Sequence, residues 1–480
     1  MTDLSDARDK RWIALALLCV AQFVVVLDAS IVNVALPTIK EALNFSEDSL
    51  PWVLNAYVLT FGGFLLLGGR LADLLGRRRL FMAGLVLFAI ASLAGGLAST
   101  SGQLIAARAV QGLGAAILSP AALSIVAVTF KDGAERNKAL GIWGAVAGSG
   151  GAAGVLLGGI LTEYVGWEWV LWVNVPIGIF AAAIAPSLIA ETKSEAETRH
   201  FDVAGAFTIT LGLSALVFAL LDAETVGWGS VQTIATIAGS LILLAAFVAI
   251  ESRSRAPLVP FSIFRVRTVT GANVVGILVG ASLFSMFYFI SLYMQQILGY
   301  SPIKAGLSYL PLAITIILAA GIASGLVTKV GFKPILAIGM ACIALGLIWF
   351  TQIDVDGTFL EDILGPSLLA AVGLGFAFVP VTIAAVSGIE DREQGLASGL
   401  INTSQQVGGA LGLAILAAVA NGIINGSHDP GKLTEGFQAA FLVGAGFAIL
   451  GLIATLVLVR TSDSKAHVAL SAQAAPAEAE

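Results

Sequence analysis

The strongest constraint on the fold is a series of fourteen apolar segments, each about long enough to cross a lipid bilayer as a helix. Such a helix needs about 20 mostly apolar residues. Of the 480 residues, 58 % are hydrophobic and only 12 % are charged, whereas soluble chains carry about 25 % charged residues. The sequence therefore predicts an all-helical membrane protein with fourteen transmembrane helices. They centre on residues 13–36, 50–69, 80–99, 104–128, 139–161, 170–190, 203–221, 231–250, 270–295, 305–327, 334–351, 364–388, 395–420 and 437–459.

The basic residues divide unequally between the two alternating sets of loops. Of the 25 lysines and arginines, 21 fall in the set that includes the N-terminus, and Arg108 lies inside a segment. The other set holds only Lys40, Lys304 and Lys432. Because loops rich in lysine and arginine stay in the cytoplasm, both termini are predicted to be cytoplasmic. The polar start lacks a small-residue cleavage site, so we expect the first segment to be retained.

The loop lengths and the positions of the cysteines and histidines argue against several classes of function. No loop is long enough to fold as a catalytic domain, so the chain is not expected to be an enzyme. Cys19 and Cys342 both fall in apolar segments, so neither a disulfide framework nor a metal site is predicted. The histidines (His200, His428 and His467) lie in polar segments, which excludes a histidine proton relay inside the membrane. No cofactor and no nucleic-acid partner is expected.

Two motifs recur eight segments later along the chain. GGRLADLLGRRR (68–79) shares its apolar frame with ASGLVTKVGFKP (323–334), and GLGAAILSP (112–120) matches GLGFAFVP (373–380). Because the offset is even, the two halves are predicted to be parallel, pseudo-symmetric six-helix bundles with two helices inserted between them. The predicted parts are an N-terminal bundle (1–190), two inserted helices and a cytoplasmic link (191–268), a C-terminal bundle (269–460) and a disordered cytoplasmic tail (461–480).

The two halves differ in their charges. Asp73 is matched by Thr328, and Arg108 is matched by an apolar position near Leu369. Charge within the membrane is therefore confined to the first half, so proton handling is expected there.

Asp28 is the only charged residue between Trp12 and Leu36. A charge near the bilayer centre costs about 2.5–3.5 kcal/mol, and desolvation favours the neutral, protonated form. A carboxyl group that takes up a proton on one side and releases it on the other can carry protons, and a cationic substrate can compete for its charge. Arg108, which keeps its proton, can pin that carboxylate. The alternatives are structural: a buried acid satisfied by a hydroxyl or amide, and a tether between helices.

Asp73 sits with Arg77, Arg78 and Arg79 at a predicted cytoplasmic junction between two helices. A carboxylate there can bind the positive N-terminus of another helix, plausibly the one predicted to begin near Gln394. Such a contact would latch the outward-facing state. The alternative, an ordinary positive-inside anchor, explains the arginines but not the aspartate.

Amide and aromatic side chains recur along one face of the ninth segment and in the first, second, fourth and thirteenth. Facing a central cavity, such residues suit flat, amphipathic cations through cation–π contacts. The alternative is hydrogen bonding between helices, which is common in bundles. The predicted substrate-binding residues are Gln22, Asn33, Tyr57, Gln111, Phe284, Tyr288, Gln295, Asn402 and Gln405.

Four stretches of the first half resemble motifs of the fourteen-spanner drug:proton antiporters of the major facilitator superfamily, the EmrB/QacA-like branch. LDASIVNVALP (27–37) is similar to the first-helix signature and GRLADLLGRRR (69–79) to the loop between helices two and three. RAVQGLGAA (108–116) is similar to the fourth-helix motif around an arginine, and GGAAGVLLGGIL (150–161) to the antiporter motif of the fifth helix. Two positions depart from the pattern: Val155 replaces a proline, and Leu74 replaces a basic residue.

The resemblance implies a major facilitator fold and a role for each motif. It assigns proton coupling to Asp28 and Arg108. The loop motif would form a conformational latch, made of Gly69, Asp73, Gly76, Arg77 and Arg78. The fifth-helix motif would supply the glycines of the antiporter helix, which are Gly154, Gly158 and Gly159. The implied function is alternating-access export of lipophilic, often cationic drugs or antibiotics in exchange for protons, by a monomer in the bacterial inner membrane. Two alternatives stay open: a proton-coupled uptake symporter of the same fold, and a membrane sensor or scaffold without transport.

Overall fold

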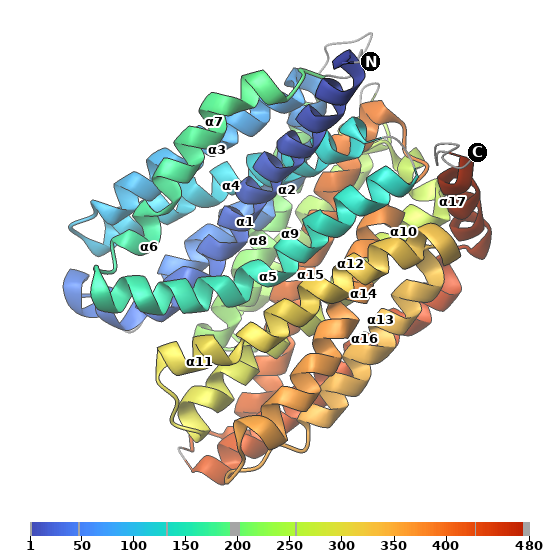
Figure 1. Cartoon of the computed structure of the whole chain (residues 1–480). Coiled ribbons are helices and arrows are strands. Elements are labelled where there is room, and N and C mark those ends of the chain that lie inside the picture. The colour runs from blue at the N-terminus through green and yellow to red at the C-terminus, as the bar shows by residue number, and fades with distance from the viewer. Residues whose placement is uncertain are drawn as a thin grey trace. The chain divides into compact units, whose positions relative to one another are not determined.

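The structure, a computed structural model, describes residues 2–46, 49–130, 133–192, 202–254, 257–427 and 429–473. Every regular element in these ranges is a helix (Figure 1), which confirms the all-helical prediction. Thirteen helical stretches within them are long and apolar enough to cross a membrane, and a bent pair within one further helix raises the number to fourteen. The predicted spans are therefore present.

The chain divides into two compact units that interleave in sequence. Unit 1 is built from Met1–Lys131, Leu157–Ile263 and Gly388–Thr403, and unit 2 from Asp132–Leu156, Phe264–Ser387 and Ser404–Glu480. Two helices, α5 (Ala134–Tyr164) and α15 (Gln394–Ile424), are therefore each divided between the units. The predicted six-plus-two-plus-six division remains a proposal, and both inserted helices belong to unit 1.

Unit 1 holds eight whole α-helices among its described residues. They are α1 (Thr2–Leu43), α2 (Trp52–Leu75), α3 (Arg77–Gly96), α4 (Ser101–Thr129), α6 (Trp169–Trp172), α7 (Asn174–Leu188), α8 (Val203–Val226) and α9 (Val231–Glu251). A 3₁₀ turn, η4 (Asp391–Glu393), leads into α15. Another 3₁₀ turn, η1 (Phe261–Arg265), stands where the chain passes from unit 1 to unit 2.

Unit 2 holds seven whole α-helices among its described residues. They are α10 (Arg267–Leu292), α11 (Pro302–Ser308), α12 (Leu310–Val330), α13 (Phe332–Phe350), α14 (Gly365–Val386), α16 (Pro430–Leu458) and α17 (Thr461–Gln473). Two single π-helical turns, η2 (Tyr293–Ile297) and η3 (Phe359–Leu364), extend α10 and precede α14.

Glycine lets neighbouring helices approach closely in both units. A Cβ atom at Gly114 of α4 would lie 2.8 Å from the backbone nitrogen of Phe88 in α3. In unit 2, a Cβ atom at Gly373 of α14 would lie 2.6 Å from the backbone nitrogen of Ile343 in α13. In lipid, such contacts between small residues replace the hydrophobic effect as the main source of helix association. The matching α3–α4 and α13–α14 pairs agree with the predicted repeat.

The outer faces of several helices are apolar. Phe207 of α8 is 63 % exposed, Ile242 of α9 is 69 % exposed and Leu318 of α12 is 62 % exposed. Exposing such apolar faces to water would destabilise the protein, whereas the hydrocarbon of a lipid bilayer is as apolar as a protein core. The exposed side chains therefore mark the surface that faces lipid.

The prediction of a disordered tail over 461–480 is wrong for its first part, because Thr461–Gln473 forms helix α17. Residues 474–480 lie outside the described part of the chain. His467 of α17 is buried, and its Nε2 atom lies 2.9 Å from Asn137 Oδ1 in the first turns of α5. The backbone N–H of Lys333 also donates to Ser464 Oγ at 3.2 Å, and the Phe332 and His467 rings lie 5.7 Å apart. Because the tail composition is polar, such tertiary contacts within unit 2 account for its order.

Candidate functional site

A buried ion pair joins α1 to α4 inside unit 1. Asp28 is fully buried and Arg108 is 1 % exposed. Arg108 Nη1 donates to Asp28 Oδ2 at 2.5 Å. Taking two such charges out of water costs several kcal/mol for each ion, which attraction offsets only if the remaining polar atoms are also bonded. The stability of the pair therefore depends on its other partners.

Two side-chain amides complete the surroundings of the Asp28 carboxylate. Gln111 Nε2 donates to Asp28 Oδ1 at 2.7 Å, and Asn174 Nδ2 donates to the same oxygen at 2.8 Å. Gln111 also accepts from Arg108 Nη1 at 2.6 Å and donates to Ser92 Oγ at 2.7 Å. We call these five residues the Asp28 cluster. All three partners of the carboxylate are hydrogen-bond donors.

The guanidinium of Arg108 is fixed on its other sides by α2. Its Nε atom donates to the backbone carbonyl of Val53 at 3.0 Å, and its Cζ atom lies 4.5 Å from the centre of the Tyr57 ring. The Tyr57 hydroxyl donates to the backbone carbonyl of Val25 in α1 at 3.2 Å. One nitrogen, Arg108 Nη2, is buried without a partner among the described residues. That nitrogen is the one donor of the guanidinium still available to a ligand.

Local sequence accounts for most of the Asp28 cluster. Arg108 and Gln111 are three residues apart on α4 and so project from the same face. Asn174 is the first residue of α7, which brings its amide to the level of Asp28 just after the short helix α6. Sequence reasoning missed Asn174. Its signal was that it is the one amide side chain between Trp169 and Leu188.

A second buried carboxylate lies where α2 meets the start of α15, also within unit 1. The backbone N–H groups of Gly395 and Leu396 donate to Asp73 Oδ1 and Oδ2 at 3.0 and 2.9 Å. Arg77 Nη2 lies 2.7 Å from Asp73 Oδ1 and also donates to the backbone carbonyl of Asp391. The structure thus places Asp73 at the N-terminus of the helix expected near Gln394, where a negative charge is stabilised by the helix dipole.

Two glycines permit the close approach of α2 at this junction. A Cβ atom at Gly69 would lie 2.4 Å from the backbone oxygen of Gly395, so only glycine fits there. Gly76, between α2 and α3, has φ +115°, which favours glycine. Arg78 Nε pairs with Glu191 Oε2 at 3.7 Å, and the backbone N–H of Arg78 donates to Glu191 Oε1 at 3.2 Å. Glu191 was not predicted as part of this junction.

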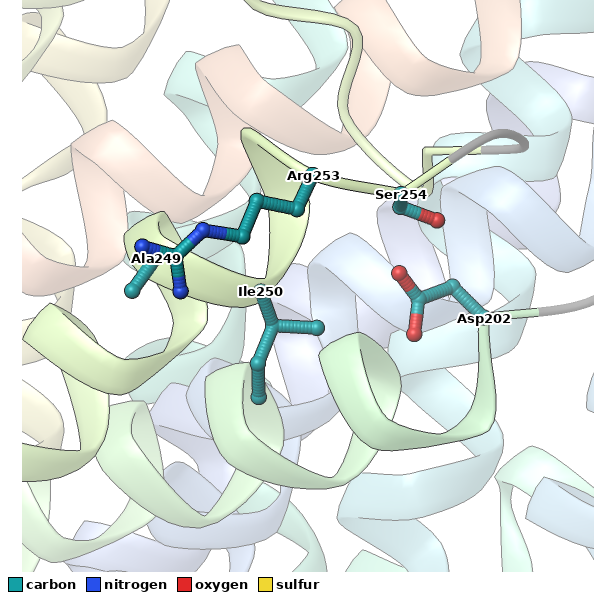
Figure 2. Close-up of a pocket in the computed structure, with 5 residues that line it drawn as sticks. All are labelled: Asp202, Ala249, Ile250, Arg253 and Ser254. Carbon is teal, nitrogen blue, oxygen red and sulfur yellow. The ribbon is translucent and has the colours of Figure 1, made fainter.

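A separate shallow cavity of about 360 Å³ lies at the adjoining ends of α8 and α9 in unit 1. Figure 2 shows the Asp202 carboxylate on one side of this space and the Arg253 side chain on the other. It is lined by Asp202, Ala249, Ile250, Arg253 and Ser254, and none of the residues predicted to bind substrate contributes to it.

Comparison with known proteins identifies the family. A sequence profile described as Major Facilitator Superfamily matches residues 18–413. The chain belongs to the major facilitator superfamily. It is 41 % identical over 448 residues to "Cephamycin export protein CmcT" of Amycolatopsis lactamdurans, covering 93 % of this chain and 92 % of that protein. It is also 36 % identical to "Puromycin resistance protein pur8" of Streptomyces alboniger, covering 94 % and 90 % of the two chains.

A solved structure agrees with the fold of this major facilitator protein. The human organic anion transporter MFSD10 (TETRAN) matches with a TM-score of 0.68 over 93 % of this chain and 99 % of that one. At 15 % identity, this likeness concerns the fold alone. Together with the family, it establishes a multi-pass membrane transporter and not an enzyme.

The fifth helix of this major facilitator protein bends without the proline of the antiporter motif. The parts Ala134–Gly151 and Ala153–Tyr164 meet at 42°, although position 155 is valine. The bend falls in a stretch that holds Gly148, Gly150, Gly151 and Gly154, and glycine lowers helix stability locally. All three predicted motif glycines, Gly154, Gly158 and Gly159, are buried. At Gly158 a Cβ atom would lie 2.6 Å from the backbone oxygen of Ile31 in α1.

Five residues predicted to bind substrate lie in unit 1: Gln22, Asn33, Tyr57, Gln111 and Asn402. Gln111 belongs to the Asp28 cluster, Tyr57 packs against Arg108 of that cluster, and Gln22 accepts from Ser119 Oγ at 2.9 Å. The amide of Asn402 donates to the carbonyl of Ser398 in its own helix at 2.9 Å. Asn33 is exposed. Hydrogen bonding between or within helices therefore occupies most of these side chains.

The other four lie in unit 2: Phe284, Tyr288, Gln295 and Gln405. Tyr288 is 43 % exposed, and Gln295 Nε2 donates to Ser291 Oγ at 2.9 Å. Gln405 Nε2 is buried and has no hydrogen-bond partner among the described residues. The side chain of Phe284 lies outside the described part of the chain.

Proposed function

We propose that this protein is a proton-coupled exporter of lipophilic, often cationic drugs or antibiotics, of the EmrB/QacA-like branch, that works by alternating access. The observation that carries the proposal is the buried Asp28–Arg108 ion pair, with its 2.5 Å contact inside an apolar bundle. The relatives named for cephamycin export and puromycin resistance support antibiotics as the substrate class. A sensor or scaffold would not need a buried charge pair.

The coupling step follows from the chemistry of that pair. As an anion, Asp28 attracts Arg108 and ties α1 to α4. Uptake of a proton removes the negative charge, and with it the attraction that offsets the cost of burying Arg108. Release of the proton on the other side of the membrane restores the pair. A cationic substrate competes for the same negative charge, so proton and substrate exclude each other.

The Asp73 contact supports a latch on the cytoplasmic side. Its carboxylate holds the first turn of α15 through two backbone N–H groups, and Arg77 holds the carboxylate. We assign this contact to the outward-facing conformation, in which the cytoplasmic entrance is closed. It would open when the protein turns inward.

The proposed setting is a bacterial inner membrane with both termini in the cytoplasm. The protein would act as a monomer, with the lipid bilayer, protons and drug-like molecules as its partners. The nine predicted substrate-binding residues remain a prediction.

The test uses inside-out membrane vesicles with an imposed proton gradient, acid inside. Lipophilic cations and neutral antibiotics are added in turn, and proton release is followed for the wild type and for Asp28→Asn. We expect a compound to discharge the gradient in the wild type and not in the variant. The control is Asp222→Asn, a charge change at the far end of α8.

Other outcomes separate the alternatives. If Asp28→Asn discharges the gradient as the wild type does, the coupling carboxylate lies elsewhere. If no compound moves the gradient, but a solute added to right-side-out vesicles enters with protons, the chain is an uptake symporter.

A further inference from the structure

A protonated Asp28 needs a hydrogen-bond acceptor that the structure does not yet offer it. The ionised carboxylate accepts from Arg108 Nη1, Gln111 Nε2 and Asn174 Nδ2, and all three groups are donors. A carboxylic acid instead donates through its O–H group. In a buried site that donor must find an acceptor, or the protonated state is penalised. One of the three neighbours must therefore change its role.

Two of the three neighbours cannot do so at low cost. Arg108 has five N–H donors and no acceptor. The amide of Gln111 is held at both ends, because Oε1 accepts from Arg108 and Nε2 donates to both Asp28 and Ser92. Turning that amide over would break all three hydrogen bonds.

Asn174 is free of this restraint. Its Nδ2 atom donates to Asp28 Oδ1 at 2.8 Å, and its Oδ1 atom is buried and has no hydrogen-bond partner among the residues that the structure describes. Asn174 itself is fully buried. The terminal torsion of asparagine is broad and nearly two-fold. A half-turn therefore brings the amide oxygen to the place of the nitrogen and costs only the one hydrogen bond that protonation removes anyway.

We propose that Asn174 is a positioning residue whose amide turns over with the protonation of Asp28, donating to the carboxylate and accepting from the acid. This inference rests on the proposed function, in which Asp28 carries the proton. The charged side chains of the cluster are Asp28 of α1 and Arg108 of α4, and the titratable Tyr57 of α2 packs against Arg108; α3 and α7 supply the neutral Ser92 and Asn174. Asn174 thus stabilises both forms of Asp28 and lowers the barrier between them.

The test is infrared difference spectroscopy of the full chain reconstituted in liposomes, between alkaline and acidic buffer. The carboxylic-acid band that Asp28→Asn removes belongs to Asp28. In Asn174→Leu, which keeps the volume but removes both polar atoms, we expect that band at higher wavenumber because the acid O–H has lost its acceptor. The matched control is Asn55→Leu, a half-buried asparagine of α2, which should leave the band in place.

A transport measurement on the same variants adds a functional readout. Because the acid would lose its one acceptor, we expect the maximal export rate of Asn174→Leu to fall about tenfold. The KM for substrate should stay within about twofold, since Asn174 acts through Asp28 and not on the substrate.

The outcomes separate this inference from the proposed function. An Asp28 band at the same wavenumber in Asn174→Leu and in the wild type overturns the role of Asn174 and leaves proton carriage by Asp28 standing. If Asp28→Asn removes no acid band at all, Asp28 does not take up the proton, and both proposals fail.

A measurement on the unaltered chain decides the matter if Asn174→Leu does not fold. Wild type labelled with carbon-13 in the asparagine side-chain carbonyls should show an asparagine amide band in the same difference spectrum. The band should vanish in Asp28→Asn. Its absence from the wild type would overturn the turning amide.

Discussion

At the scale of single residues, the Asp28 cluster depends on the ion pair between Asp28 and Arg108, in which each charge compensates the other. Arg108 has partners from three helices, and Asp28 accepts from three side chains. A pair of this kind is weak evidence for net stability, but removing one partner leaves an uncompensated buried charge. The two members should therefore be strongly coupled in their effect on unfolding.

The double-mutant cycle of this pair is the first prediction. Arg108→Leu alone should lower the free energy of unfolding by about 3–5 kcal/mol, because Asp28 loses its counter-charge. Asp28→Asn combined with Arg108→Leu should recover much of that loss. Thermal unfolding in detergent, followed by tryptophan fluorescence, measures both. Arg79→Leu, whose side chain is 73 % exposed, is the control and should change little. Additive effects of the two substitutions would mean that the pair is not coupled.

At the scale of helices, the start of α15 is held by a carboxylate from another helix. Asp73 occupies the place of an N-cap acceptor for Gly395 and Leu396. Such an acceptor contributes about 1 kcal/mol, and the helix dipole adds to it. A contact of this size fits the proposed latch, which must hold one conformation and then break during transport.

Removing this acceptor should expose the first turns of α15. Ser398 is fully buried in the structure, so a cysteine there reports opening, in a background with Cys19 and Cys342 replaced by serine. With Asp73→Ala we expect labelling of Ser398→Cys by an impermeant maleimide, applied from the cytoplasmic side, to speed up about fivefold.

The matched control for this experiment is Asp429→Ala. Asp429 caps α16, because its Oδ2 atom accepts from the Lys432 N–H at 3.1 Å. It should leave the labelling rate unchanged. Equal rates for Asp73→Ala and the parent would show that Asp73 is not a latch.

At the scale of the whole molecule, the repeat predicted from sequence reappears in the contacts of each unit. Gly76 and Gly331 both end a helix with positive φ, at +115° and +87°. Asp73 binds the first turn of α15, and Thr328 accepts from Asn137 Nδ2 in the first turn of α5 at 3.0 Å. The two halves thus share one kind of junction, with a charge in the first and a neutral hydrogen bond in the second.

The orientation of this repeat is the prediction that belongs to the whole chain. Because 21 of 25 basic residues lie in one set of loops, that set should face the cytoplasm. Alkaline phosphatase fused after Gly229 should be active, whereas the same fusion after Ser254 should not. A green fluorescent protein fused after Glu480 should fluoresce. If the phosphatase fused after Ser254 were active, the predicted orientation of the chain in the membrane would be wrong.

Part of the candidate site could be predicted because it consists of charged residues at positions where the surrounding segment is apolar. Asp28 and Arg108 lie in apolar segments, and lipid penalises an unpaired charge so strongly that each implied a partner. Asp73 likewise implied a helix N-terminus. Asn174 is the one amide of its apolar segment, but a neutral amide costs less to bury than a charge and so did not imply a particular partner. Glu191 follows the end of α7, outside the apolar segments, where a carboxylate is ordinary.

The sequence by itself determined the fold class, the number of spans and the distribution of basic loops, because a membrane imposes length and polarity on each segment separately. Only the tertiary structure decided that Gln111 and Asn174 donate to Asp28, that α5 bends without proline, and that α17 is ordered by contacts such as His467 with Asn137. Hydropathy is a property of neighbouring residues, whereas a hydrogen-bond partner is chosen by packing among helices far apart in the chain.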